Sequence, residues 1–331
     1  MLCRSCPRQI HTLLLNVTIF PAKKQIAAKA TFWRKLREER CIMFFGGKAM
    51  KEVLREEEWY QTSDATTGGL RLYRVHSVVV RKKTPYQQVE ILDVEKLGRS
   101  LFLDGVLQSA EADEYIYHEL LVHPAMVAHP APERVLVCGM GEGQAVREIL
   151  RYPTVKEVVG VDIDREVVEL CRQHLKGSLT GSPRCRLVFT NAAEYVATCP
   201  AGSFDVAVVD VTDDPFGLAS TVLSENFFKE LYRVLKEKGS VAVQGTSANY
   251  AFGGKGFSWL YRMVSGIFPT VLPYVEFIPS YEDLWGFLLC LKGLEGRPLQ
   301  PFPPDLRYLD EETYRRAFLL PRPLRKALEK E

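Results

Sequence analysis

A glycine-rich segment and a downstream aspartate form the first pattern in this sequence that is suited to binding a small molecule. Gly139, Gly141 and Gly143 follow the apolar run 134–138, and a helical pattern begins directly after them. Glycines at such a turn let the backbone approach a ligand at the carboxyl edge of a parallel sheet. Asp162 ends the next apolar run, where a carboxylate accepts hydrogen bonds from ribose hydroxyls. This order predicts a nucleoside site, but it does not distinguish NAD from S-adenosylmethionine or a relative.

Carboxylates cluster after a later strand of the same pattern. Asp210, Asp213 and Asp214 follow the apolar run that begins at residue 204, and Glu142 lies inside the glycine segment. A single acid in such a place caps a helix or faces solvent, whereas clustered carboxylates repel one another unless a cation joins them. The cluster therefore predicts a site for ammonium groups beside the nucleoside. The histidines and cysteines lack the spacing of metal ligands, so no metal is expected.

Two hydrophobic patterns position these residues. Residues 58–110 alternate between polar and apolar, and Asp104-Gly105 is a favoured pair for a two-residue hairpin turn, which predicts a small antiparallel β domain. A helix over 113–122, ended by Pro124, is expected to follow. Strands then alternate with helices, which predicts an α/β fold with a parallel, doubly wound, Rossmann-like sheet of the methyltransferase type. The expected strands are 134–138, 158–162, 186–189, 204–210, 240–244 and 284–291, and the expected helices are 144–151, 165–175, 224–235 and 257–267.

The charge is unevenly distributed along the chain. Residues 1–50 carry ten Lys and Arg but only two Glu, whereas the whole chain has a net charge of +2, so the remainder is acidic. An acidic body is poorly suited to nucleic acid. The apolar run 13–20 is too short to span a membrane, and the scattered cysteines are typical of a reducing, cytoplasmic compartment.

These patterns divide the chain into four parts. For the first part, a targeting leader or a structural arm remains an alternative to an extension. The predicted parts are a basic extension outside the fold (1–50), an N-terminal β-strand domain with a linking helix (51–122), a Rossmann-like catalytic domain (123–296) and a C-terminal helical tail (297–331).

Several motifs over residues 58–331 resemble, in chain order, those of the polyamine aminopropyltransferases, that is, spermidine synthase and its thermospermine-forming relatives. The resemblance implies transfer of the aminopropyl group of decarboxylated S-adenosylmethionine to a polyamine, with putrescine as the commonest acceptor and methylthioadenosine released. It further implies a homodimer or homotetramer without a cofactor, because the donor is a co-substrate. The motifs are Thr84-Pro-Tyr-Gln87, Leu103-Asp-Gly-Val-Leu-Gln108-Ser109, Asp113-Glu-Tyr-Ile-Tyr117-His118-Glu119, Gly139-Met-Gly-Glu142-Gly143, Asp162-Ile-Asp164, Asp210-Val-Thr-Asp213 and Ile278-Pro-Ser-Tyr281.

The same resemblance implies roles for individual residues. Asp210 is the base that frees the attacking amine, and Tyr117 orients that amine. The residues expected to bind the donor are Gln87, Gly139, Gly141, Asp162, Asn191, Ala192 and Leu218, and those expected to bind the polyamine are His118, Glu142, Asp213 and Tyr281.

This sequence also departs from the family pattern. Met140 replaces a usual glycine, Asn191-Ala192 replaces Asp-Gly beside the expected adenine, and Leu218 stands where proline is common. One residue is added around Asp213 and Asp214 relative to the family pattern, which leaves open whether Asp213 or Asp214 is the second acid of the site. The spacing from Asp210 favours Asp213.

Two other functions share part of the pattern. A methyltransferase that uses intact S-adenosylmethionine would have the same sheet, glycine segment and Asp162, and a polyamine-binding pseudoenzyme would agree with the departures. The acceptor also stays open between putrescine, agmatine and spermidine, because residues 279–286 resemble a thermospermine-type segment. Trp285 in that segment is interpreted as a core residue.

Overall fold

The computed structural model describes residues 44–45, 48–49, 59–63, 69–177, 181–212, 218–251 and 255–329. The chain divides into two units, Met1–Glu56 and Glu57–Glu331. Within the first unit the described residues form two short antiparallel strands, β1 (Phe44–Phe45) and β2 (Lys48–Ala49). The predicted extension, residues 1–50, otherwise lies outside the described residues.

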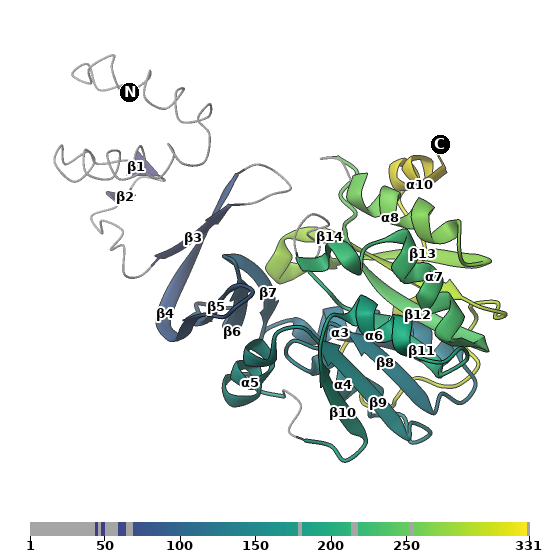
Figure 1. Ribbon diagram of the computed structural model, residues 1–331. Coiled ribbons are helices and arrows are strands. Elements are labelled where there is room, and N and C mark those ends of the chain that lie inside the picture. Colours follow the sequence, from purple (N-terminus) through teal and green to yellow (C-terminus); the bar gives the residue numbers. More distant parts are fainter. Residues whose placement is uncertain are drawn as a thin grey trace. The chain divides into compact units, whose positions relative to one another are not determined.

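A seven-stranded sheet forms the centre of the second unit (Figure 1). The order of its strands is β10-β9-β8-β11-β12-β14-β13, and the five strands from β10 to β12 are parallel. The chain continues from β8 to β9 on one side and returns to β11 on the other, which creates a topological switch point at β8. The strands are β8 (Arg134–Cys138), β9 (Glu157–Asp162), β10 (Cys185–Phe189), β11 (Phe204–Val209), β12 (Leu235–Ser247), β13 (Thr270–Ile278) and β14 (Asp283–Leu291).

The predicted Rossmann-like sheet is therefore confirmed, but its last two strands differ from the expected parallel pattern. β14 is antiparallel to both β12 and β13, and no strand was predicted for β13. Only the short 3-10 turn η4 (Pro279–Tyr281) separates β13 from β14. A parallel pair needs a crossover of a dozen or more residues, so this connection requires antiparallel pairing.

Helices cover both faces of the large sheet. Val135 and Val137 of β8 pack with α3 and α4, whereas Leu136 and Cys138 pack on the opposite side with α6 and α7, and all four are fully buried. Side chains alternate between the two faces of a strand, so these neighbours serve two separate cores. The helices are α3 (Glu114–Ala128), α4 (Gln144–Ile149), α5 (Arg165–His174), α6 (Ala192–Thr198), η3 (Leu218–Thr221), α7 (Glu225–Val234), α8 (Lys255–Ser265), α9 (Glu311–Ala317) and α10 (Arg322–Glu329).

A five-stranded antiparallel sheet precedes the large sheet, as predicted. Its hairpin turn at Asp104 and Gly105 is also confirmed, because both residues have positive φ angles, 48° and 83°, as a type I′ turn requires. Val89 and Ile91 of this sheet pack against Val167 of α5, which joins it to the larger sheet. Its strands are β3 (Trp59–Ser63), β4 (Leu70–Lys83), β5 (Gln88–Val94), β6 (Gly98–Leu103) and β7 (Val106–Ala110).

The expected end of the helix at Pro124 was wrong, because α3 continues to Ala128. Proline lacks the N–H that would bond the carbonyl four residues earlier. In this helix the buried hydroxyl of Tyr274 donates to that carbonyl, the oxygen of Leu120, at 2.9 Å. A side chain from β13 thus replaces the missing backbone donor, and the helix passes the proline without a break.

We expect Tyr274→Phe to lower the free energy of unfolding by about 1 to 3 kcal/mol, because it leaves a buried carbonyl without a donor. The matched variant Pro124→Ala restores the backbone N–H. In that background Tyr274→Phe should cost much less, and denaturant unfolding of the four proteins measures the coupling. Equal costs in both backgrounds would contradict this explanation.

The C-terminal tail is tied to α3 by one buried acid. Glu119 is 1% exposed, and its two carboxylate oxygens accept the backbone N–H groups of Arg307, Tyr308 and Leu309 at 2.8 to 2.9 Å. This contact anchors the segment that leads into α9.

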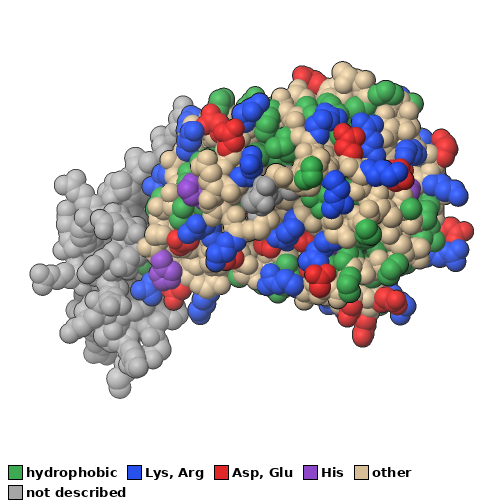
Figure 2. Space-filling view, turned by 90° about the horizontal axis from the view of Figure 1, so that it is seen from below, with side chains coloured by type: hydrophobic (Ala, Val, Ile, Leu, Met, Phe, Trp, Pro, Cys, Tyr) green, Lys and Arg blue, Asp and Glu red, His purple; other side chains and the backbone are tan. Residues whose placement is uncertain are grey.

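The surface charge and the lengths of the helices concern two expectations from the sequence, that the protein binds no nucleic acid and does not span a membrane. Figure 2 shows acidic and basic side chains interspersed over the face seen from below, unlike the single-sign stripe that suits a phosphate backbone. None of the helices in the described part of the chain is long and apolar enough to cross a membrane.

Candidate active site

A cavity of about 550 Å³ opens at the carboxyl ends of β8, β9 and β11, where the small sheet faces the large one. Ligands of open α/β sheets bind at such a switch point. The predicted site residues that line it come from segments far apart in the sequence. They are Gln87, Tyr117, His118, Gly139, Gly141, Glu142, Asp162, Asn191, Ala192, Asp210 and Tyr281.

The glycine segment wraps around the carboxylate of Asp162. Oδ2 accepts the backbone N–H groups of Met140 and Gly141 at 2.9 and 2.7 Å, and Oδ1 accepts that of Asp164 at 2.8 Å. Burial raises the pKa of Asp162, and these backbone hydrogen bonds offset part of the rise. A carboxylate has about four acceptor positions, and these three bonds leave one on Oδ1; the predicted contact of Asp162 with a ribose stays a prediction.

Gly139 allows the carboxyl ends of β8 and β11 to approach each other closely. Its φ angle is +81°, and a Cβ atom there would lie 2.1 Å from the carbonyl oxygen of Asp210. Gly141 also has a positive φ, 43°, but a Cβ there would meet no atom within 4 Å. The first glycine therefore serves the contact between strands, and the second borders open space.

Gln87 is held at the cavity from the small sheet. Its Nε2 donates to Oδ2 of Asp164 at 3.3 Å, and the Thr84 hydroxyl donates to the same oxygen at 2.6 Å. Because Asp164 also caps α5, this one carboxylate connects the small sheet to the helix that follows β9.

Asn191 has structural partners at the cavity wall. Its Oδ1 accepts the N–H of Ala193 at 2.8 Å and so caps α6, and its Nδ2 donates to the Thr221 hydroxyl at 3.0 Å. Its predicted place beside an adenine stays a prediction, as does that of its neighbour Ala192.

Asp210 and Tyr117 meet in the wall of the cavity. The Tyr117 hydroxyl donates to Oδ1 of Asp210 at 2.7 Å. Burial raises the pKa of the Asp210 carboxyl above its usual value, and the charge of His118 together with the Tyr117 hydrogen bond offsets part of that rise. A carboxylate with a raised pKa in a cavity is suited to accept a proton from a bound amine.

His118 lies between two acids. Its Nδ1 is 3.1 Å from Oε2 of Glu114, and its Nε2 is 3.4 Å from Oε1 of Glu142. Burial alone lowers the pKa of His118, but the hydrogen bond to Glu114 and the charges of Glu142, Glu114 and Asp210 outweigh burial and raise it to about 9. Burial likewise raises the pKa of Glu142 to about 7, against the charge of His118. The acids on both sides of the ring thus favour the protonated form of His118.

Two family models match the two sheets of this chain. The model described as the spermidine synthase tetramerisation domain matches residues 58–111, and the spermine/spermidine synthase domain matches residues 114–296. The chain belongs to the spermine/spermidine synthase family of polyamine aminopropyltransferases. Curated members include polyamine aminopropyltransferase 2 of Caldanaerobacter subterraneus subsp. tengcongensis, which is 50% identical over 82% of this chain and 92% of its own length. Polyamine aminopropyltransferase 2 of Pseudomonas aeruginosa is 39% identical over 71% of this chain and 68% of its own.

Solved structures of spermidine synthase share this fold. A crystal structure of spermidine synthase in complex with the transition state analogue AdoDATO has a TM-score of 0.78 and 30% identity, and covers 84% of this chain and 98% of that one. The spermidine synthase of Thermotoga maritima has a TM-score of 0.77 and 29% identity, and covers 84% of this chain and 97% of that one.

Some residues that line the cavity of this aminopropyltransferase were not predicted from the sequence as site residues. Trp285 was interpreted as core, yet it lines the cavity, and its buried Nε1 has no hydrogen-bond partner in the described part of the chain. Asp283, two residues earlier on β14, is 4% exposed and accepts from Nδ2 of Asn249 at 3.1 Å. The other unassigned lining residues include Thr62, Arg71, Tyr73, Gln108 and Gln244.

A sequence signal for some of these residues was present. Arg71 and Tyr73 are two positions apart on β4, as Asp283 and Trp285 are on β14, and residues at that spacing share one face of a strand. Gln108 also lies inside a matched motif. Which face of β4 or β14 is turned toward the cavity, however, is decided only by the tertiary structure.

Three residues predicted in the segment after β11 have no described side chain. Asp213 and Asp214 lie outside the described residues, and Leu218 begins η3 but its side chain lies outside them as well. The choice between Asp213 and Asp214 therefore stays a prediction. Among the described residues, no group of three His, Cys, Asp or Glu side chains is arranged to hold a metal ion.

Proposed function

We propose that this protein transfers the aminopropyl group of decarboxylated S-adenosylmethionine to an amine of putrescine and releases methylthioadenosine. The observation that carries the proposal is the hydrogen-bonded pair of Asp210 and Tyr117 in the wall of a cavity that Asp162 and the glycine segment also line. A base for an amine thus lies beside a site suited to a nucleoside.

The proposed reaction requires a neutral amine. An ammonium group of the acceptor gives one proton to Asp210. The lone pair of its nitrogen then attacks the aminopropyl carbon that is bonded to the sulfonium sulfur. A C–N bond forms while the C–S bond breaks, and its electron pair stays on sulfur as the thioether of methylthioadenosine. Tyr117 restricts the Asp210 carboxylate to one orientation, and holding both reactants in line contributes much of the acceleration.

The charge and the aromatic rings of one part of the cavity wall support a diamine as the acceptor. Asp283 is a buried acid of the cavity wall, and Tyr281 and Trp285 present aromatic rings 4.9 Å apart. A carboxylate binds a distal ammonium group, while aromatic rings contact both methylene groups and cations. These features are also compatible with agmatine or a triamine.

Mass analysis of the products tests the proposal and separates the alternatives. Purified protein is given the decarboxylated donor with putrescine, agmatine or spermidine in separate reactions, and intact S-adenosylmethionine in a parallel set. We expect methylthioadenosine and spermidine from putrescine. Methylated product from the intact donor would indicate a methyltransferase, and acceptor binding without methylthioadenosine would indicate a pseudoenzyme.

We further propose that the protein assembles as a homotetramer in the cytoplasm. The match to a tetramerisation domain over residues 58–111 supports the assembly, as do the exposed apolar side chains of Leu70, Leu72 and Val78 on β4. The five described cysteines are free thiols, which supports a reducing compartment. Light scattering of the purified protein measures the assembly directly, and a monomer at micromolar concentration would contradict it.

A further inference from the structure

An ion pair between Glu114 and Arg147, which does not line the cavity, contacts His118 of the active site. Glu114 is one helical turn before His118 on α3, so the two side chains share a face. The guanidinium of Arg147 on α4 binds both carboxylate oxygens of Glu114, at 3.2 and 3.0 Å. A two-point contact of this kind fixes the orientation of the carboxylate as well as its charge.

Glu114 in turn fixes the imidazole ring of His118. The Nδ1 atom of His118 lies 2.8 Å from the backbone oxygen of Glu114 and 3.1 Å from Oε2, so this nitrogen carries a hydrogen. The opposite nitrogen, Nε2, points at Glu142. A second hydrogen, on Nε2, makes the ring an imidazolium, and the acids on both sides of the ring stabilise that charge.

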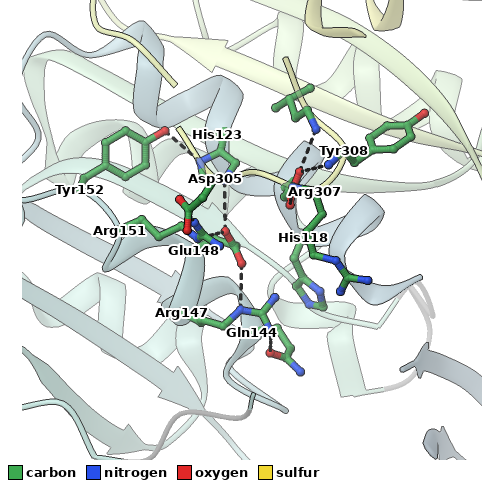
Figure 3. Close-up of polar contacts among 12 residues, drawn as sticks. His118, His123, Gln144, Arg147, Glu148, Arg151, Tyr152, Asp305, Arg307 and Tyr308 are labelled. Atoms are coloured by element: carbon green, nitrogen blue, oxygen red, sulfur yellow. Dashed lines mark hydrogen bonds and ion pairs between the residues drawn. The ribbon is translucent and has the colours of Figure 1, made fainter. Parts of the chain in front are cut away.

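The pair is also held from behind. Arg147 donates through Nε to Oε1 of Glu148 at 2.8 Å, and Glu148 contacts Arg151 and His123 (Figure 3). Burial alone raises the pKa of Glu114, but the hydrogen bonds and charges of His118 and Arg147 keep it below its usual value. Glu114 therefore stays ionised.

We propose that Glu114, held by Arg147, is a positioning residue that keeps His118 protonated and thereby limits how strongly Glu142 and the base Asp210 hold a proton. The groups that face His118 are Glu114 and Tyr117 of α3, Glu142 of the glycine segment and Asp210 at the end of β11. His118 supplies the positive charge among them. Without that charge, burial would raise the pKa of both carboxylates further, and a carboxyl that already holds a proton cannot accept one from the acceptor.

The proposal rests on the proposed function only where it concerns turnover, because the protonation of His118 is measurable without it. Histidine-selective NMR of the intact protein, assigned by the signal that His118→Gln removes, should show His118 losing its proton only near pH 9. In Glu114→Gln that midpoint should fall by at least about one pH unit. A neutral His118 at pH 7 in the unaltered protein would overturn the proposal, whether or not the variant folds.

The pH profile of turnover supplies the second readout. Loss of the imidazolium raises the pKa of Asp210 and Glu142, so in Glu114→Gln the acidic limb of kcat/KM for the acceptor should move to higher pH. Where the pH lies below the shifted limb, kcat/KM should fall by up to about tenfold for each unit of that shift, and the deficit should shrink as the pH approaches 9. A loss of the same size at every pH would indicate a merely structural role and contradict the proposal.

A matched control separates this effect from the loss of a charge in general. Glu311→Gln makes the same change at an exposed partner of Arg315 on α9 and should leave both readouts unchanged. In a His118→Gln background, Glu114→Gln should add little further shift, because both changes remove one imidazolium. If the two shifts add in full, Glu114 acts by another route.

Discussion

Asp210→Asn should reduce kcat by on the order of 100- to 10,000-fold while donor affinity changes by less than about threefold. Asparagine keeps the size of the side chain and can still accept a hydrogen bond from Tyr117, but it cannot take a proton from the acceptor ammonium group. Donor contacts are expected from Gln87, Asp162 and the glycine segment, which the substitution leaves in place. Steady-state kinetics with calorimetric titration of the donor measure both quantities.

The same change at Asp162 is the matched comparison. Asp162→Asn removes the charge that two backbone N–H groups of the glycine segment hold, so we expect weaker donor binding with a smaller effect on kcat. The two variants should therefore give a crossed pattern. Near-normal turnover of Asp210→Asn, or a larger loss in Asp214→Asn, would show that the base has been assigned to the wrong acid.

Gly139→Ala should both destabilise the protein and lower kcat by about 100-fold or more. The new Cβ would lie 2.1 Å from the carbonyl oxygen of Asp210, so the end of β8 and the end of β11 must move apart. A shift of about 1 Å at a catalytic group costs on the order of 100-fold. The positive φ angle of +81° adds strain of about 1 to 2 kcal/mol. Thermal unfolding and turnover measure the two effects.

Gly141→Ala is the control for that prediction. It meets a similar backbone penalty, with φ at +43°, but its Cβ would contact no protein atom within 4 Å. We therefore expect a smaller loss of stability and a loss that falls on donor affinity, because the methyl group projects into the open space of the cavity. Equal effects of both alanines on kcat would contradict the distinct roles of the two glycines.

Local patterns in the sequence determined much of this protein. Period-two alternation and the Asp104-Gly105 pair predicted the small antiparallel sheet and its turn, and the alternation of apolar runs with helical segments predicted the parallel part of the large sheet. The glycine segment and the acids at strand ends predicted five residues of the cavity wall, and the family resemblance added the other predicted ones. These features follow from the sequence because each one depends on neighbouring residues and on the rule that strand ends of a parallel sheet share an edge.

Only the tertiary structure decided the features that depend on distant partners. The passage of α3 through Pro124 depends on a hydroxyl from β13, the antiparallel β14 on the short turn before it, and the place of Trp285 on the packing of β14 against α3. The charge of His118 likewise depends on Glu142 and Asp210, which come from two other strand ends, and on Arg147 behind Glu114. A sequence pattern gives the side chains available at each position, but whether a buried group finds a donor, an acid or a cavity is determined by segments far away along the chain.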